Sequence, residues 1–182
     1  SHSKVGIFYV FMGFPCPLPA KYGIPFDICM SERTLNGQSF YQLSPKANAL
    51  MYKAVHELVD WQREDGTLYS PVPSGTWNKE LPAQMLSSIS TYGFWYYYRH
   101  TGDAETMAYV YPAVRKYLSV WTLDEDGLTV GRKGEWSWGD WGTNIDLRLI
   151  LASWHYLALQ SAINIAGITG NEADIAGYQS IQ

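Results

Sequence analysis

The sequence has few of the residues that metal and nucleotide chemistry require. Its 182 residues include only two cysteines and four histidines, and none of them has the spacing of a Cys-x-x-Cys or His-Glu-x-x-His metal motif. The motifs Gly-x-Ser-x-Gly, Gly-x-Gly-x-x-Gly and Walker A do not occur either. We therefore expect no protein-bound metal and no cofactor. The two cysteines, Cys16 and Cys29, fit either one disulfide in an oxidising compartment or two reduced thiols.

The sequence also lacks a strong charge of one sign. Thirteen basic and seventeen acidic residues give a net charge of −4, with no stripe of Lys and Arg, so we do not expect nucleic acid as a partner. The segment 145–166 is apolar on nearly every face, but five polar side chains interrupt it. Because such side chains are costly in a bilayer, we expect a helix buried by other helices and no membrane partner.

Aromatic residues are abundant. The hydrophobic fraction is 47%, the charged fraction 16%, and the chain holds 8 Trp and 14 Tyr. This composition excludes disorder for the bulk of the chain and fits one folded domain. Trp and Tyr combine an apolar face with a hydrogen-bonding edge, which suits sugar rings, although most of them are expected to fill the core.

Hydrophobic periodicity predicts an all-α fold. After an N-terminal loop segment, 1–43, the hairpin domain 44–182 should contain five helices, near 44–62, 82–100, 103–121, 145–167 and 171–180. The first, third and fifth are amphipathic, whereas the second and fourth are apolar all round and should be more buried than their neighbours. Alternating inner and outer helices are typical of a toroid of helical hairpins.

Two repeats in the connections support the toroid. Tight turns with Gly102-Asp103 and Gly170-Asn171 lie 68 residues apart, and in each we expect Gly to end one helix and Asp or Asn to cap the next. The long connections, 65–81 and 124–144, each begin near an Asp-Gly pair, and these pairs are 61 residues apart. Function is expected at the end of the ring where the long loops gather.

The second long loop is the strongest candidate for a binding surface. Between Gly134 and Gly142 it holds three tryptophans and two carboxylates outside any predicted helix: Glu135, Trp136, Trp138, Asp140 and Trp141. A ligand surface explains them better than a packing cluster in the loop. Thr143 and Asn144 lie closer to the next helix and are the expected caps. The first long loop adds Trp77 and Glu80, for which a binding and a packing role are equally supported.

The N-terminal third holds two further carboxyls. Asp27 and Glu32 could form a paired-carboxylate site, or they could be solvated loop charges with Glu32 neutralised by Arg33. From composition alone the second interpretation is favoured.

A set of motifs occurs along the chain in a fixed order. The motifs are Ser39-Phe40-Tyr41, Trp61-Gln62-Arg63-Glu64-Asp65-Gly66-Thr67-Leu68, the Pro-rich loop to Trp77, Tyr98-Arg99-His100-Thr101-Gly102-Asp103, Tyr111-Pro112 and Trp138-Gly139-Asp140-Trp141. In this order they resemble the catalytic domain of the α-L-rhamnosidases of the six-hairpin (α/α)6 glycosidase class, which implies an all-α, partial (α/α)6 toroid. The resemblance covers most of residues 39–180, and the ordered set is more specific than any one piece.

The resemblance implies inverting hydrolysis of an α-L-rhamnoside, with a carbohydrate as the substrate. Glu32 would be the general acid, and Asp27 would assist it by holding sugar hydroxyls, as would Asp140. The remaining residues that line the pocket would be Trp77, Glu135, Trp136, Trp138 and Trp141. The acid loop departs from the family pattern, because Thr34-Leu35-Asn36-Gly37-Gln38 lacks the family's Trp and second Asp.

The resemblance also implies that the chain supplies five or six of the twelve helices of the family's ring. The general base would then belong to the missing C-terminal half. The alternatives are a non-catalytic carbohydrate-binding relative with a degenerate acid loop and a structural fragment that pairs with another chain. A half ring would leave Tyr92, Trp95, Leu149 and Trp154 uncovered, so we expect self-association or pairing with the missing half.

Overall fold

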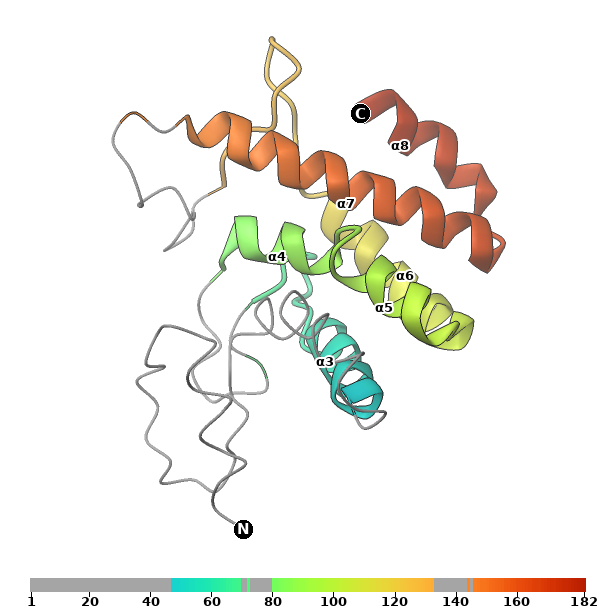
Figure 1. The fold of residues 1–182 in the computed structure, drawn as a ribbon. Helices are drawn as coiled ribbons and strands as arrows, with labels where there is room; N and C mark the ends of the chain where they lie inside the picture. Colours follow the sequence, from blue (N-terminus) through green and yellow to red (C-terminus); the bar gives the residue numbers. More distant parts are fainter. Residues whose placement is uncertain (1–46, 70–71, 73–79, 133–143, 145) are drawn as a thin grey trace, which may run out of the picture.

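The described residues of the computed structural model are 47–69, 72, 80–132, 144 and 146–182. They form α3 (Ala47–Asp60), α4 (Pro82–Ile89), α5 (Phe94–Thr101), α6 (Ala104–Leu118), α7 (Leu147–Thr169), the 3-10 turn η3 (Glu172–Asp174) and α8 (Ile175–Ile181) (Figure 1). Within these residues the only strand-like pairing is an isolated bridge between Leu123 and Thr129. The predicted all-α class is confirmed.

The helix α7 is the centre of the packing. It packs against α4 and α5 on one side, against α6, and against α8 on the other side, while α3 packs against α5 and α6 (Figure 1). The contacting faces form one hydrophobic core, whose largest fully buried side chains include Met51, Leu58, Met85, Phe94, Met107, Tyr117, Leu159 and Ile165. The helical pairs are therefore joined through a shared core rather than through a sheet.

The predicted single helix 82–100 is wrong, because the chain leaves the helix between α4 and α5. Ser90 has an extended backbone, and its Oγ donates to the Ser87 carbonyl at 2.7 Å and accepts from the Tyr92 N–H at 3.1 Å. The Thr91 N–H donates to the Leu157 carbonyl of α7 at 3.2 Å. The break ties the two short helices to α7, and a continuous apolar sequence gives no sign of it.

The two tight turns are confirmed as left-handed glycine caps, with φ of 68° at Gly102 and 75° at Gly170. The residues that follow them differ. Asp103 caps α6, accepting the Thr106 N–H at 2.9 Å, but Asn171 makes no side-chain cap bond and its Nδ2 donates back to Thr169. The cap predicted for Asn171 is wrong, because a 3-10 turn begins there instead of a regular helix.

This difference predicts unequal effects of truncation at the two equivalent positions. The Asp103 carboxylate also accepts the hydroxyls of Thr106 at 2.6 Å and Tyr97 at 2.7 Å. Asp103→Ala should therefore lower the free energy of unfolding by about 1–2 kcal/mol, as expected for a lost N-cap, and Asn171→Ala by about 0.5 kcal/mol or less. Urea denaturation of both variants checks this; equal losses would contradict the assignment of Asp103 as the cap.

The two Asp-Gly sequences form the same turn. In the first, the Arg63 N–H donates to the Thr67 carbonyl and the Gly66 N–H to the Arg63 carbonyl. In the second, the Asp124 N–H donates to the Leu128 carbonyl and the Gly127 N–H donates to the Asp124 carbonyl. Both glycines have positive φ, 89° and 76°, which favours glycine. The sequence repeat of 61 residues is thus also a structural repeat.

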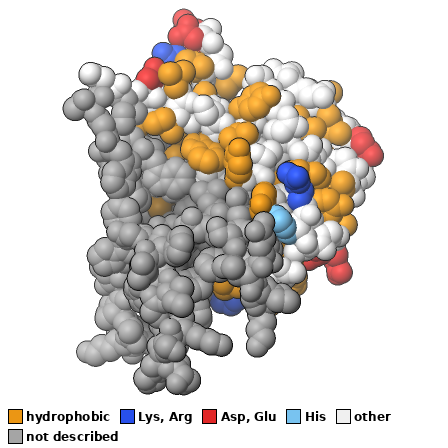
Figure 2. All heavy atoms as spheres, in the orientation of Figure 1, with side chains coloured by type: hydrophobic (Ala, Val, Ile, Leu, Met, Phe, Trp, Pro, Cys, Tyr) orange, Lys and Arg blue, Asp and Glu red, His pale blue; other side chains and the backbone are white. Residues whose placement is uncertain are grey.

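The predicted burial of the inner helices is confirmed for α4 and wrong for α7. All eight residues of α4 are buried. Only eight of the 23 residues of α7 are buried, against seven of 15 in α6, because one side of α7 has no helix against it among the described residues. Leu149 is 58% exposed and Tyr92 50% exposed, as expected, whereas Trp95 and Trp154 are half-buried. Figure 2 shows hydrophobic side chains exposed on the face of the molecule that is in view.

The helix α7 begins after Asp146 and is 23 residues long. The side chain of Asp146 caps this helix by accepting the Arg148 N–H at 2.9 Å. The prediction of Asn144 as the cap is wrong, since its φ is 64°, and Thr143 lies outside the described residues. By length and composition α7 could cross a membrane, but 44% of its apolar stretch is buried inside the protein, where it packs on four helices.

Candidate functional site

The residues predicted to form the site all lie outside the described part of the chain, so their arrangement stays a prediction. They are Asp27, Glu32, Trp77, Glu135, Trp136, Trp138, Asp140 and Trp141. The structure does describe the ends of the two long connections, where each one meets the helical body. These ends are residues 67–69 and 80 for the first connection and residues 122–132 for the second.

A bidentate ion pair joins the two connections. The Nε of Arg132 donates to Oε1 of Glu80 at 2.8 Å, and its Nη2 donates to Oε2 at 3.3 Å. The remaining nitrogen, Nη1, donates to the Val120 carbonyl at 3.0 Å. The side chain of Glu80 is 8% exposed and that of Arg132 is 25% exposed. Charge-assisted hydrogen bonds of this geometry fix both distance and orientation.

Two aromatic rings, Tyr117 in the last turn of α6 and Trp121 just after it, lie beside the ion pair. The guanidinium carbon of Arg132 lies 5.7 Å from the ring centroid of Trp121, and that ring meets Tyr117 edge to face at 6.0 Å. Tyr117 is fully buried, and burial raises its pKa well above the usual value. The hydrogen bonds that Arg132 donates to Glu80 raise the pKa of the guanidinium, which therefore stays positively charged at neutral pH.

Two carboxylates of the Asp-Gly turns, Asp65 and Asp124, have lowered pKa values. Hydrogen bonds from Thr67 lower the pKa of Asp65, and the backbone N–H of Leu128 together with Arg148 lowers that of Asp124. A general acid at neutral pH needs a raised pKa. Arg148 bridges Asp124 at 2.6 Å and Asp126 at 2.9 Å. Arg148 therefore holds the second turn to the start of α7.

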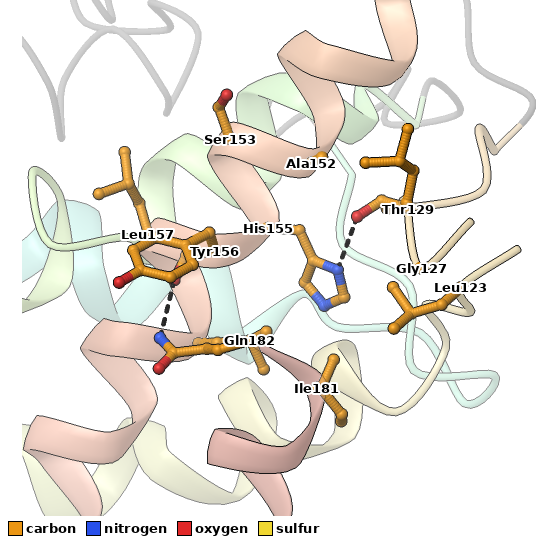
Figure 3. A pocket seen from close by; sticks show the side chains of 12 residues that line it. Leu123, Gly127, Thr129, Ala152, Ser153, His155, Tyr156, Leu157, Ile181 and Gln182 are labelled. Carbon is orange, nitrogen blue, oxygen red and sulfur yellow. Dashed lines mark hydrogen bonds between the residues drawn. The ribbon is translucent and has the colours of Figure 1, made fainter.

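A pocket of about 570 Å³ lies between the second turn, the middle of α7 and the end of α8 (Figure 3). The ring of His155 points from α7 toward Thr129, and its Nδ1 is 3.0 Å from the Thr129 Oγ1. Nε2 has no hydrogen-bond partner among the described residues. Burial lowers the pKa of His155 to about 4, so the imidazole is neutral at pH 7. Sequence reasoning set this histidine aside because nothing near it in the chain suggests a ligand site.

The bond between His155 and Thr129 has a structural consequence. Thr129 is 2% exposed and belongs to the isolated bridge with Leu123. The bond therefore ties the second connection to α7 a few residues before Arg132. Within the described ranges no group of three or more His, Cys, Asp or Glu side chains could hold a metal ion.

The paired helices, the repeated turns and the long connections joined by one ion pair define an all-α protein built of helical hairpins. The family model of the bacterial alpha-L-rhamnosidase 6 hairpin glycosidase domain matches residues 36–182. The chain belongs to this family. Neither the curated proteins nor the solved structures include a match.

Proposed function

We propose that this chain takes part in the hydrolysis of a terminal α-L-rhamnoside, or of a related sugar, with inversion at the anomeric carbon. The observation that carries the proposal is the match of residues 36–182 with a glycosidase domain, because membership of that family implies a carbohydrate substrate. The Trp-rich segment lies inside the match and supplies the residue types that sugar rings require: aromatic faces for the C–H groups and carboxylates for the hydroxyls.

In this proposal Glu32 donates the proton to the leaving oxygen, a role that requires a carboxyl group with a raised pKa. Asp27 and Asp140 hold sugar hydroxyls, and the tryptophans line the sugar. Inversion also needs a carboxylate base about 6.5–9.5 Å from the acid, on the other side of the sugar. The resemblance assigns that base to no residue of this sequence.

One observation favours a second function, that of a carbohydrate-binding relative without catalysis. The family match begins at residue 36, so it leaves out Asp27 and Glu32 while it includes Trp77 and the segment 135–141. Trp77 and the segment 135–141, which are proposed to line the sugar, thus have stronger support than Glu32, which is proposed to cleave its bond.

A measurement of substrate turnover distinguishes hydrolysis from carbohydrate binding alone. Release of the aryl alcohol from an aryl α-L-rhamnoside supports hydrolysis. Quenching of tryptophan fluorescence by rhamnose without turnover supports binding alone. Dimerisation in light scattering, with neither turnover nor quenching, would support the structural alternative and contradict both proposals. Galactose and glucose at the same concentrations serve as controls for sugar specificity.

A further inference from the structure

The described part of the second connection, residues 122–132, contains one buried residue, Thr129. Its Oγ1 lies 3.0 Å from Nδ1 of His155, which is buried in the middle of α7. The turn that precedes Thr129 is open, since a Cβ atom at Gly127 would meet nothing within 4 Å. The contact between Thr129 and His155 is therefore the buried polar bond that holds this connection against α7.

The other contacts of the connection lie nearer to solvent or at its end. Arg148 of α7 binds Asp124 and Asp126, but each of these side chains is at least 30% exposed, and exposed ion pairs contribute little to stability. Arg132 joins the end of the connection to Glu80 and not to α7. The connection can therefore leave α7 between these points without separating the helices, as local openings do in other proteins.

The imidazole of His155 cannot accept a second proton while it stays in place. A neutral ring has one N–H donor and one acceptor nitrogen, whereas a protonated ring has two donors. Nδ1 can donate to the Thr129 hydroxyl, but Nε2 has no partner among the described residues. Protonation would thus leave a buried charged donor without an acceptor, which is costly. The pocket beside the ring lies between the connection, α7 and α8 (Figure 3), so movement of the connection admits water.

Few titratable groups face this ring in the described part of the protein. The pocket lining holds one other, Tyr156 of α7. Neither α4 nor α8 has a charged side chain, and the end of α6 presents the ring of Trp121 at 5.7 Å. The other charged side chains on the helices that pack against α7 are exposed, apart from Asp174, which pairs with Arg115 at 3.5 Å. Burial accordingly is the cause that lowers the pKa of His155 to about 4.

We propose that the contact between Thr129 and His155 is an acid-released latch: protonation of the imidazole detaches residues 122–130 from α7 while the helices stay packed. The closed form binds one proton fewer than the open form between pH 6.5 and about 4. The closed form is therefore favoured above pH 6.5, and the open form gains as the pH falls through this range. The inference does not depend on the proposed function.

Hydrogen exchange at pH 7 and pH 5, corrected for the intrinsic pH dependence of amide exchange, tests the latch. The Val130 N–H donates to the Thr122 carbonyl at 2.9 Å, and a short two-stranded turn loses such bonds once it is detached. In the wild type, protection of peptides covering 122–132 should fall by at least about tenfold from pH 7 to pH 5. Peptides from α6 should stay at least about tenfold better protected at both pH values, because the opening is local.

Three variants test the two partners. His155→Gln is neutral at both pH values, so the change in protection of 122–132 should shrink to less than about twofold. His56→Gln is the matched control, because His56 makes the same type of contact, 3.1 Å to Thr106 Oγ1, but is only half-buried; this variant should keep the wild-type change. Thr129→Val keeps the shape, removes the hydroxyl and should lower protection at pH 7 by about fivefold, the effect of one hydrogen bond.

Three results would overturn the latch. The first is equal protection of 122–132 at pH 7 and pH 5 in the wild type. The second is a change with pH that persists in His155→Gln or an unchanged protection at pH 7 in Thr129→Val. The third is equal protection of 122–132 and α6, which would mean that the connection opens only when the whole protein unfolds.

Discussion

Gly93→Ala should lower the free energy of unfolding by about 3 kcal/mol or more, the range of severe overpacking. A Cβ atom at this position would lie 1.7 Å from the carbonyl oxygen of Ser88 and 2.5 Å from its carbonyl carbon. These are backbone atoms of α4, so a rotamer change cannot relieve the clash. The φ of Gly93 is −103°, which other residues also adopt, so the close approach of the backbone is what requires glycine.

Gly167→Ala is the matched control for Gly93→Ala. Gly167 lies within α7, and a Cβ there would meet nothing within 4 Å. Alanine should therefore stabilise the protein by about 0.5–1 kcal/mol through helix propensity alone. Urea denaturation midpoints measure both effects. If Gly93→Ala lowered the free energy of unfolding no more than Gly167→Ala does, the close approach of Gly93 to the Ser88 carbonyl at the break between α4 and α5 would be contradicted.

The burial of His155 should make stability fall as the pH falls from about 6.5 to about 4. Burial lowers its pKa to about 4 in the folded state, against 6.5 for the ordinary residue. Between these values the unfolded chain binds the proton and the folded chain does not, so the stability contribution is complete above pH 6.5 and is lost on acidification. A shift of this size corresponds to about 3 kcal/mol.

His155→Gln isolates this contribution. Glutamine is neutral throughout the range, and its side-chain oxygen can still accept the hydroxyl of Thr129, the partner of His155 at 3.0 Å. Chemical denaturation at steps between pH 4 and 7 should show a smaller slope for the variant than for the wild type, with the difference accumulating below pH 6.5. Identical slopes would show that the imidazole is not buried in solution.

Local sequence patterns were sufficient for features that depend on local chemistry. The apolar stripe of the segment 103–121 predicted α6, and Gly102 and Gly170 predicted the left-handed caps that the structure confirms. The break at Ser90 could not be predicted, because a long-range contact with the Leu157 carbonyl helps to stabilise it. The extra exposure of α7 likewise depends on which helices lie beside it, which periodicity does not report.

The candidate site likewise has features that the local sequence indicates and features that depend on long-range contacts. Tryptophans grouped outside helical spacing pointed to the segment 134–142, whose placement stays a prediction. The sequence indicated Glu80 but gave no signal for Arg132, because the two are 52 residues apart and only the packing of α4 and α6 against α7 brings the ends of their connections together. His155 was missed for a similar reason, since its partner Thr129 lies in a different connection.

A structural role and a ligand-binding role of Asp140 can be distinguished by experiment. An aspartate in this part of the chain could instead cap α7, but Asp146 fills that position. Gly139 and Gly142, on either side of Asp140 and Trp141, allow the backbone to turn sharply. We therefore expect the carboxylate of Asp140 to serve a ligand.

The most direct test of this central claim is a paired measurement on Asp140→Asn in the complete protein: the denaturation midpoint and a rhamnose titration. Asparagine keeps the shape and removes the charge. The account predicts a change in stability of no more than about 0.5 kcal/mol and a loss of sugar-binding free energy of about 1.5–3 kcal/mol, the size of a lost charged hydrogen bond. A large loss of stability with unchanged rhamnose binding would contradict it.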